Sequence, residues 1–159
     1  MSYSQSVESP LGRIALHSNG TALTHLDIGG KVATPQPDTI TQTAAEQLAE
    51  YFDGQRTHFD LPLAPEGTAF QESIWSALQA IPYGDSLSYG ELGLRAGRPG
   101  AARAVGAAVG ANPLPIVIPC HRVLASDRKI TGYSGGDGIP TKKKLLALEG
   151  ISYRELPSR

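Results

Sequence analysis

The spacing of apolar residues changes near residue 62, and this change constrains the fold more than any other feature of the chain. Residues 13–18 and 21–28 alternate apolar and polar side chains, as half-buried strands do. Residues 70–81 instead carry apolar side chains at the spacing of a helical stripe. The stretch between these patterns, residues 62–67, is rich in turn-forming residues. We therefore expect two domains, an N-terminal one with its linker (1–66) and a C-terminal one (67–159).

The first domain is predicted to be a small α/β unit. The Asn-Gly pair at 19–20 favours a type I′ hairpin turn between the two alternating stretches. The capping-box spacing of Thr43 and Glu46 predicts a helix that ends near residue 54. A third strand is expected over residues 57–63, where a proline at position 62 limits it to a sheet edge. These elements predict a three-stranded antiparallel sheet with one helix.

The second domain is predicted to be mainly helical. Capping boxes at Thr68–Gln71 and Ser88–Glu91 open two helices, which end before Pro82 and near Gly97. A further helix is expected over residues 101–111, after a Pro-Gly turn. The last two helices and the glycine-containing turn between them have the lengths of a helix-turn-helix motif. The predicted class of the whole chain is α/β.

The helix expected over residues 101–111 has almost no bulky side chains. It is built of Ala, Gly and Val, and Arg103 is its one cation. Helices that read bases in the major groove need several long polar side chains. A nearly smooth helix is better suited to close approach to a minor groove. It could also pack tightly against its own domain, and both can hold on different faces.

Charge is distributed unevenly along the chain. The net charge is −1, but residues 1–80 carry three basic and nine acidic side chains, whereas residues 81–159 carry eleven basic and six acidic ones. A basic half beside an acidic half indicates that one part faces a polyanion and the other does not.

Cys120 is the one cysteine of the sequence. A single cysteine excludes an internal disulfide and a multi-cysteine zinc site, so we expect no metal. The histidines at 17, 25 and 58 have no cysteine nearby in sequence and are expected at the surface or at strand edges. The first residues lack the pattern of a signal peptide, and no apolar run approaches the about 20 residues that span a bilayer. The expectation is a cytoplasmic protein with no membrane contact.

The sequence around Cys120 carries the chemistry. A short buried strand is expected over residues 116–118, followed by Cys120, His121 and Arg122. A thiol beside a histidine and an arginine can have a lowered pKa, and the thiolate is the nucleophile. His121 could be its base and Glu149, at the end of the last helix, could orient that base. Neighbouring side chains tend to point apart, so a bridging water is easier to build than a direct Cys–His bond. A buried, inert cysteine is the alternative.

The motif IPCHRV is preceded by SYGEL and AARAVGAAVGANPLP and followed by TGYSGG and LLALEG. In this combination it resembles the O6-alkylguanine-DNA alkyltransferase family, over residues 68–150. The resemblance implies DNA repair by direct reversal: the damaged guanine is flipped out of the duplex and its alkyl group is transferred irreversibly to Cys120, in a single turnover. It implies duplex DNA containing O6-alkylguanine as the partner, no cofactor, and a monomer.

The resemblance also implies roles for individual residues. The catalytic set consists of Cys120, His121, Glu149, Tyr89 and Lys142. Cys120 is the alkyl acceptor, His121 is its general base acting through water, and Glu149 is the acid that orients His121. Tyr89 helps to rotate the nucleotide and donates a proton to the guanine, and Lys142 lies near the thiolate. The substrate-binding set comprises Asn112, Val123, Tyr133, Ser134 and Val109. The DNA-binding set comprises Arg103, which fills the gap left by the flipped base, with Ala102, Tyr89 and Arg122.

Three other functions are compatible with parts of the sequence. The first is a protein that only binds O6-alkylguanine and recruits other repair factors, although relatives of that type have lost the cysteine of the motif. The second is a helix-turn-helix regulator, which the lack of long base-reading side chains disfavours. The third is a thiol hydrolase that uses Cys120 and His121, for which ester turnover would be diagnostic.

Overall fold

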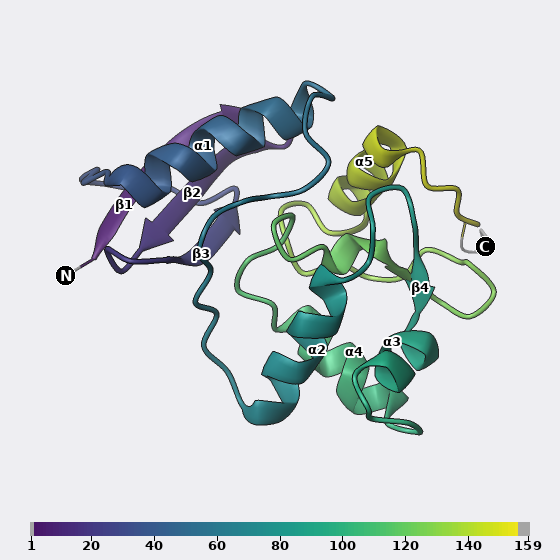
Figure 1. Ribbon diagram of the computed structural model, residues 1–159. Coiled ribbons are helices and arrows are strands. Elements are labelled where there is room, and N and C mark those ends of the chain that lie inside the picture. The colour runs from purple at the N-terminus through teal and green to yellow at the C-terminus, as the bar shows by residue number, and fades with distance from the viewer. Residues whose placement is uncertain (1, 156–159) are drawn as a thin grey trace. The chain divides into compact units, whose positions relative to one another are not determined.

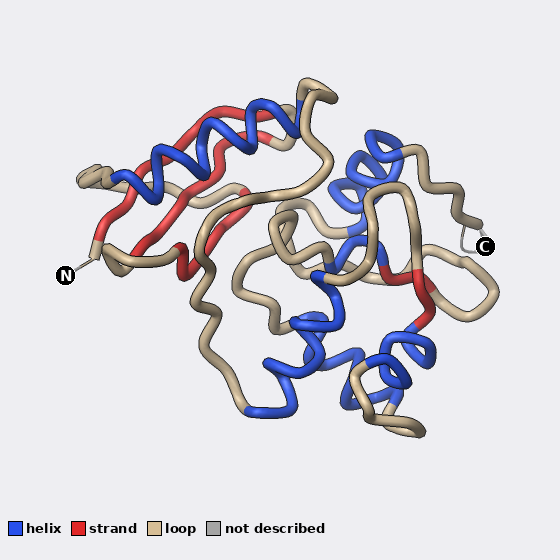
Figure 2. Tube along the Cα trace, in the orientation of Figure 1, coloured by secondary structure: helices blue, strands red, loops and turns tan. Residues whose placement is uncertain are grey.

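The computed structural model describes residues 2–155, which form two compact units. Unit 1 holds the chain up to Glu66 together with Pro113–Val117. Unit 2 holds Gly67–Asn112 and the chain from Ile118 onward. Figure 2 shows the three long strands in unit 1 and most of the helices in unit 2. The predicted α/β class, with an antiparallel sheet before a mainly helical part, is confirmed.

The described elements begin with three strands and one helix and continue with four helices, two short strands and a 3₁₀ turn. Unit 1 contains β1 (Tyr3–Ser9), β2 (Gly12–Ser18), β3 (Leu23–Ile28) and α1 (Thr39–Phe52). Unit 2 contains α2 (Ala69–Gln79), β4 (Leu87–Ser88), α3 (Tyr89–Arg95), α4 (Ala102–Gly110), the 3₁₀ turn η1 (Cys120–Arg122), β5 (Val123–Leu124) and α5 (Ile139–Glu149). Among these residues no helix is long and apolar enough to cross a membrane.

Unit 1 is an antiparallel sheet in the order β1-β2-β3 with α1 along one face (Figure 1). The helix contacts all three strands. Ile14 and Leu16 of β2 and Leu48 and Tyr51 of α1 are buried. Removal of these side chains from water supplies the main stabilisation of the unit.

Two sequence predictions for unit 1 are wrong in detail. The third strand is β1, whose mostly polar residues give little apolar signal, and residues 57–63 form only an isolated bridge at Leu63. Pro62 lacks an N–H and contributes its carbonyl alone, to the amide of Leu23 at 2.9 Å. Helix α1 begins earlier than predicted because Asp38 is its N-cap and forms a capping box with Thr41.

Helix starts in unit 2 match the sequence prediction closely. Thr68 caps α2 and Ser88 caps α3, each with the reciprocal bond to the residue three positions on. Helix α4 buries Val105 and Ala108, and the indole of Trp75 in α2 donates to the Ala108 carbonyl at 2.8 Å. The α3–α4 pair therefore packs on α2 as one body.

The strand predicted over residues 116–118 does not form. Ile116 instead lies in a turn with φ of 76° and is buried. A left-handed conformation at a β-branched residue costs roughly 1–2 kcal/mol. The reversal lets Asn112 reach across it and donate to the Ile118 carbonyl at 2.8 Å, immediately before Cys120.

Gly93 of α3 is required for the α3–α4 turn. A Cβ at Gly93 would lie 3.0 Å from the Arg98 carbonyl oxygen and 3.3 Å from Val105. Gly93→Ala should therefore lower the free energy of unfolding by about 1–3 kcal/mol. Gly90→Ala in the same helix is the control, because its Cβ would meet only Ser88 at 3.9 Å, and it should be neutral or stabilising by up to about 1 kcal/mol. Urea unfolding measures both, and equal effects would contradict this account.

Candidate active site around Cys120

The turn that holds Cys120 is placed by a short pair of strands. β5 begins directly after η1 and pairs in parallel with β4, with Leu87 opposite Val123. β4 leads directly into α3, so Tyr89 at the start of that helix is brought beside the cysteine turn. In the sequence, the rest of α3 and the whole of α4 separate Tyr89 from Cys120.

A pocket of about 120 Å³ opens over the cysteine. Five residues predicted for the site line it together: Tyr89, Val109, Cys120, Tyr133 and Ser134. The remaining lining residues are glycines that sequence reasoning missed: Gly106, Gly110 and Gly132. Their contribution is the absence of a side chain, which leaves room for a flat ligand, and a sequence provides little signal for that.

Cys120 is 4 % exposed. Burial raises its pKa above the ordinary value, because the interior disfavours the charged form. Hydrogen bonds from Asn112 and Tyr133 and the positive charge of Lys142 act in the opposite direction. The resting group is therefore a thiol, and a base must remove its proton before it can attack.

Lys142 is the cation whose charge acts to lower the pKa of the Cys120 thiol. Its ammonium is buried, donating to the Val123 carbonyl at 2.7 Å and to the Thr131 hydroxyl at 3.3 Å. Burial lowers the pKa of Lys142 to about 8, and the adjacent Cys120 acts against this shift. Helix α5 begins at Ile139, and Lys142 in its first turns points into the site.

His121 has one nitrogen paired and one available. Its Nε2 lies 2.6 Å from the Glu149 carboxylate, and its Nδ1 has no hydrogen-bond partner among residues 2–155. Burial lowers the pKa of His121, and Glu149 acts against that shift, so the resting ring is neutral. A carboxylate can only accept, so the proton lies on Nε2 and Nδ1 carries the lone pair of a base.

Arg122 does not have the exposed position that a DNA contact requires. It is 6 % exposed, and its Nε and Nη2 donate to Glu149 at 2.7 and 3.1 Å. Its Nη1 donates to the Ile81 carbonyl at 2.6 Å. The prediction that Arg122 contacts DNA is therefore wrong. Its guanidinium is buried and binds the Glu149 carboxylate.

Hydrogen bonds connect several predicted site residues to the pocket wall. The Ser134 hydroxyl donates to the Gly110 carbonyl at 2.9 Å. The Tyr89 hydroxyl lies 2.8 Å from that of Thr131, a residue that sequence analysis did not single out. No motif or spacing in the sequence marks Thr131 as a site residue, so its position beside Tyr89 is seen only in the folded structure.

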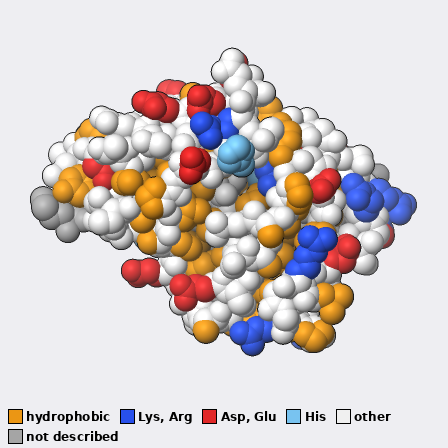
Figure 3. Space-filling view, viewed as in Figure 1, with side chains coloured by type: hydrophobic (Ala, Val, Ile, Leu, Met, Phe, Trp, Pro, Cys, Tyr) orange, Lys and Arg blue, Asp and Glu red, His pale blue; other side chains and the backbone are white. Residues whose placement is uncertain are grey.

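The outer face of α4 is smooth and carries one charge. Ala102, Arg103, Ala104 and Ala107 are exposed, while Val105 faces the core. The inner face therefore packs against its own domain, whereas close approach of the outer face to a minor groove stays a prediction. In Figure 3, most Lys and Arg side chains of the drawn face lie over unit 2, in keeping with the basic second half of the sequence.

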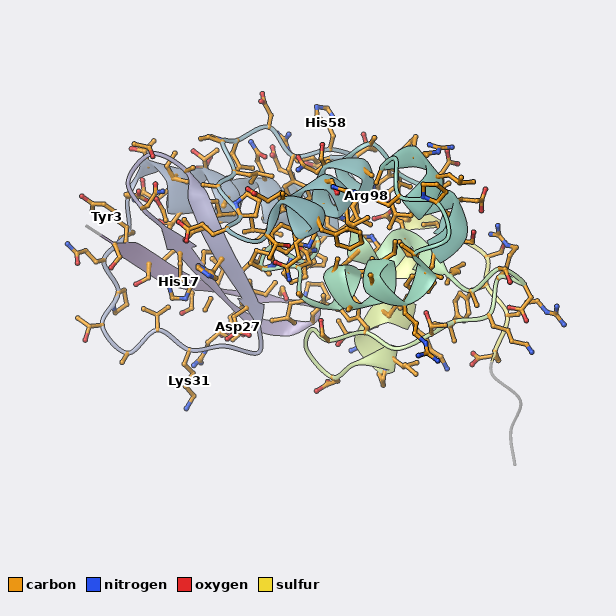
Figure 4. The ribbon with its side chains drawn as sticks, turned by 90° about the horizontal axis from the view of Figure 1, so that it is seen from below. Tyr3, His17, Asp27, Lys31, His58 and Arg98 are labelled. Atoms are coloured by element: carbon orange, nitrogen blue, oxygen red, sulfur yellow. The ribbon has the colours of Figure 1, made fainter. Side chains whose placement is uncertain are left out.

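The histidines of unit 1 do not gather into a site. The rings of His17 and His25 meet edge to face at 6.2 Å between centroids, and Figure 4 shows His58 well apart from His17. Within the described part of the chain, no three His, Cys, Asp or Glu residues lie close enough to hold a metal ion. Figure 4 also labels Arg98, whose guanidinium lies over Phe70, 5.3 Å from the ring centroid.

Models of two protein families match the chain. Residues 69–151 match the model described as 6-O-methylguanine DNA methyltransferase, DNA binding domain. Residues 2–65 match the model described as 6-O-methylguanine DNA methyltransferase, ribonuclease-like domain.

Individual relatives give the same assignment over nearly the full length. A methylated-DNA–protein-cysteine methyltransferase of Methanosarcina barkeri is 48 % identical, over 96 % of this chain and 99 % of the relative. One of Haemophilus influenzae is 45 % identical, over 91 % and 84 %. A crystal structure of Mycobacterium tuberculosis OGT in complex with DNA is 44 % identical, with a TM-score of 0.83 over 92 % of this chain and 91 % of that one.

The ion pairs of Glu149 generate a stability prediction. Glu149→Gln would leave the buried Arg122 charge without a counter-charge, and the free energy of unfolding should fall by about 3–5 kcal/mol. Glu155→Gln is the control, because that carboxylate is exposed where it binds Lys143 at 2.8 Å, and its loss should cost less than about 1 kcal/mol. Urea unfolding of both variants checks this, and similar losses would show that Glu149 does not support the site.

Proposed function

The chain belongs to the methylated-DNA–protein-cysteine methyltransferase family, and we propose that Cys120 is the cysteine that receives the alkyl group. The protein is an O6-methylguanine-DNA methyltransferase, which repairs DNA by moving the methyl group from the guanine onto itself. Each molecule reacts once, because the product is a thioether, which water does not cleave, and the cysteine is not regenerated.

The observation that carries the assignment to Cys120 is the pairing around His121. The ring offers an unprotonated Nδ1, while Nε2 is held by Glu149 at 2.6 Å. A water molecule bound to Nδ1 would pass the thiol proton to the ring. The carboxylate would then stabilise the imidazolium that forms. General-base help of this kind is commonly worth ~10²–10⁴-fold in rate.

The transfer itself makes one bond and breaks one. The sulfur of Cys120 attacks the alkyl carbon, and the bond from that carbon to guanine O6 breaks with its electron pair on the base. Guanine leaves poorly as an anion, so a proton delivered to the base as the bond breaks lowers the barrier. Tyr89, at the pocket wall, is the donor that this proposal assigns.

The pocket residues have separate parts in holding the base, together with Val123 and Asn112, which do not line the pocket. Tyr133 forms a wall, and Ser134 would donate to the guanine oxygen once its hydroxyl turns away from the Gly110 carbonyl. The Val123 carbonyl keeps a second lone pair beside the one that Lys142 uses, and that lone pair can accept from the guanine amine. Asn112 ties α4 to the turn before Cys120, and Val109 gives an apolar contact.

Helix α4 is the element assigned to DNA. It starts at Ala102 without a capping side chain, so its first amides remain available to a phosphate. Its small outer side chains permit close approach to a minor groove. Arg103 would occupy the space that the flipped base leaves, since a planar guanidinium stacks well on bases.

The binding-only alternative is disfavoured by the site itself. A protein that merely recognised the damaged guanine would need neither a nucleophile nor a general base to activate that nucleophile. Here Cys120 lines the pocket, and the next residue, His121, has an Nδ1 atom without a hydrogen-bond partner in the described part of the chain. No observation specifically favours the regulator or the hydrolase.

Alkylation should be stoichiometric and confined to one residue. O6-methylguanine duplex DNA should add one methyl group to the protein, and peptide mapping by mass spectrometry should place it on Cys120. Cys120→Ser, with nearly the same volume, should bind the DNA but gain no mass. Repeated turnover by one molecule, or an adduct elsewhere, would refute the assignment.

Arg103 should matter for duplex DNA and not for the free base. Flipping costs a few kcal/mol of stacking and pairing, part of which Arg103 would offset. Arg103→Ala should therefore slow methyl transfer from duplex DNA sharply and leave the reaction with free O6-benzylguanine nearly unchanged. Equal losses with both substrates, together with a lower melting temperature, would show that Arg103 instead supports its own domain.

A further inference from the structure

The hydroxyl of Thr131 lies between two groups of the active site. It is 2.8 Å from the phenol oxygen of Tyr89 and 3.3 Å from the ammonium nitrogen of Lys142. Three segments distant in sequence therefore meet at one oxygen atom: the start of α3, the loop before α5, and α5 itself. The catalytic roles proposed above do not use Thr131.

The direction of the bond between Lys142 and Thr131 follows from the donor available. An ammonium group can only donate, so the Thr131 oxygen accepts from Lys142. Thr131 has one proton of its own, and the phenol oxygen of Tyr89 is its partner on the other side. With that proton directed at its oxygen, Tyr89 can turn its own proton towards the pocket, where the damaged base would lie. The Tyr89–Thr131 bond can run in either direction, and the relay uses the one in which Thr131 donates.

We propose that Thr131 is a positioning residue that relays a proton from Lys142 to Tyr89 during alkyl transfer. This inference rests on the proposed function of Cys120 and deepens it. As the bond between the alkyl carbon and O6 breaks, Tyr89 gives its proton to the guanine. Thr131 gives its proton to the phenol oxygen, and Lys142 gives one to Thr131. The thiolate and the ammonium become a thioether and an amine, and the guanine leaves neutral, so charge balances.

Two features of the surroundings support the relay. Thr131 follows Ile130, which is anchored in a buried cluster with Leu124, Leu146 and Ile151, so the hydroxyl is held in place. Lys142 is buried and has a pKa of about 8, which makes its proton easier to give than that of an exposed lysine. The Val123 carbonyl accepts from the ammonium nitrogen at 2.7 Å, which fixes Lys142 beside Thr131.

The test uses a variant that keeps the shape and removes the hydroxyl. Single-turnover methyl transfer from duplex DNA is timed for Thr131→Val, Thr131→Ser and Tyr89→Phe, and for Tyr89→Phe combined with Thr131→Val. Thr131→Val should react about tenfold more slowly than the unaltered protein, as expected for loss of one charge-assisted hydrogen bond. Thr131→Ser should restore most of the rate. In the Tyr89→Phe background, Thr131→Val should change the rate little, because the relay then has no end point.

Three results would overturn the relay: a native rate for Thr131→Val, no rescue by Thr131→Ser, or the same slowing by Thr131→Val in both backgrounds. A purely structural role predicts the last of these. If Thr131→Val fails to fold, Thr131→Ala takes its place in the same comparison. The unaltered protein is the check on the proposed function: if it gains no methyl group on Cys120, that function fails, whereas normal alkylation with unaffected Thr131 variants removes only the relay.

Discussion

The carboxylate of Glu149 binds three partners at once, and the geometry of the active site depends on it. His121 and Arg122 pair with it from the cysteine turn, and the backbone amide of Gly84 approaches it at 3.3 Å. The end of α5, the turn η1 and the loop after α2 are thereby joined through a single charge. A buried polar group destabilises the fold unless its hydrogen bonds are satisfied. Loss of one of these partners would therefore weaken the positions of the others.

Burial acts on the three reactive groups in one direction: it disfavours charge on each. It raises the pKa of Cys120 and lowers those of His121 and Lys142. The resting site therefore keeps a neutral thiol and a neutral base, and creating the thiolate is uphill. Alkyl transfer removes the charge from the sulfur and leaves a neutral thioether. An interior that resists charge thus favours the product and helps to make the reaction irreversible.

Helix α4 serves two surfaces with very small side chains. Its inner face, through Val105 and Ala108, packs on α2, where the Trp75 indole fastens it. Its outer face presents alanines and Arg103, and Gly106 and Gly110 leave space in the pocket. Small residues allow close approach on both sides, so one thin helix can lie between the protein core and the DNA that we propose it binds.

Local signals in the sequence determined the helix starts at Thr68 and Ser88, the presence of a hairpin between β2 and β3 and the family motif around Cys120. The type I′ turn predicted at 19–20 is wrong, because Asn19 lacks the positive φ of that turn and residues 19–22 connect the two strands. Capping involves residues three positions apart, so no tertiary information is needed to predict it. The sequence could not assign the third strand to β1, whose polar residues gain their place only from pairing with β2. The sequence also offered no basis for predicting that Arg122 is buried against Glu149, 27 residues away, or that Thr131 lies beside Tyr89, 42 residues away. Those contacts were decided only by tertiary packing, because a side chain's distant partners depend on where the whole fold places them.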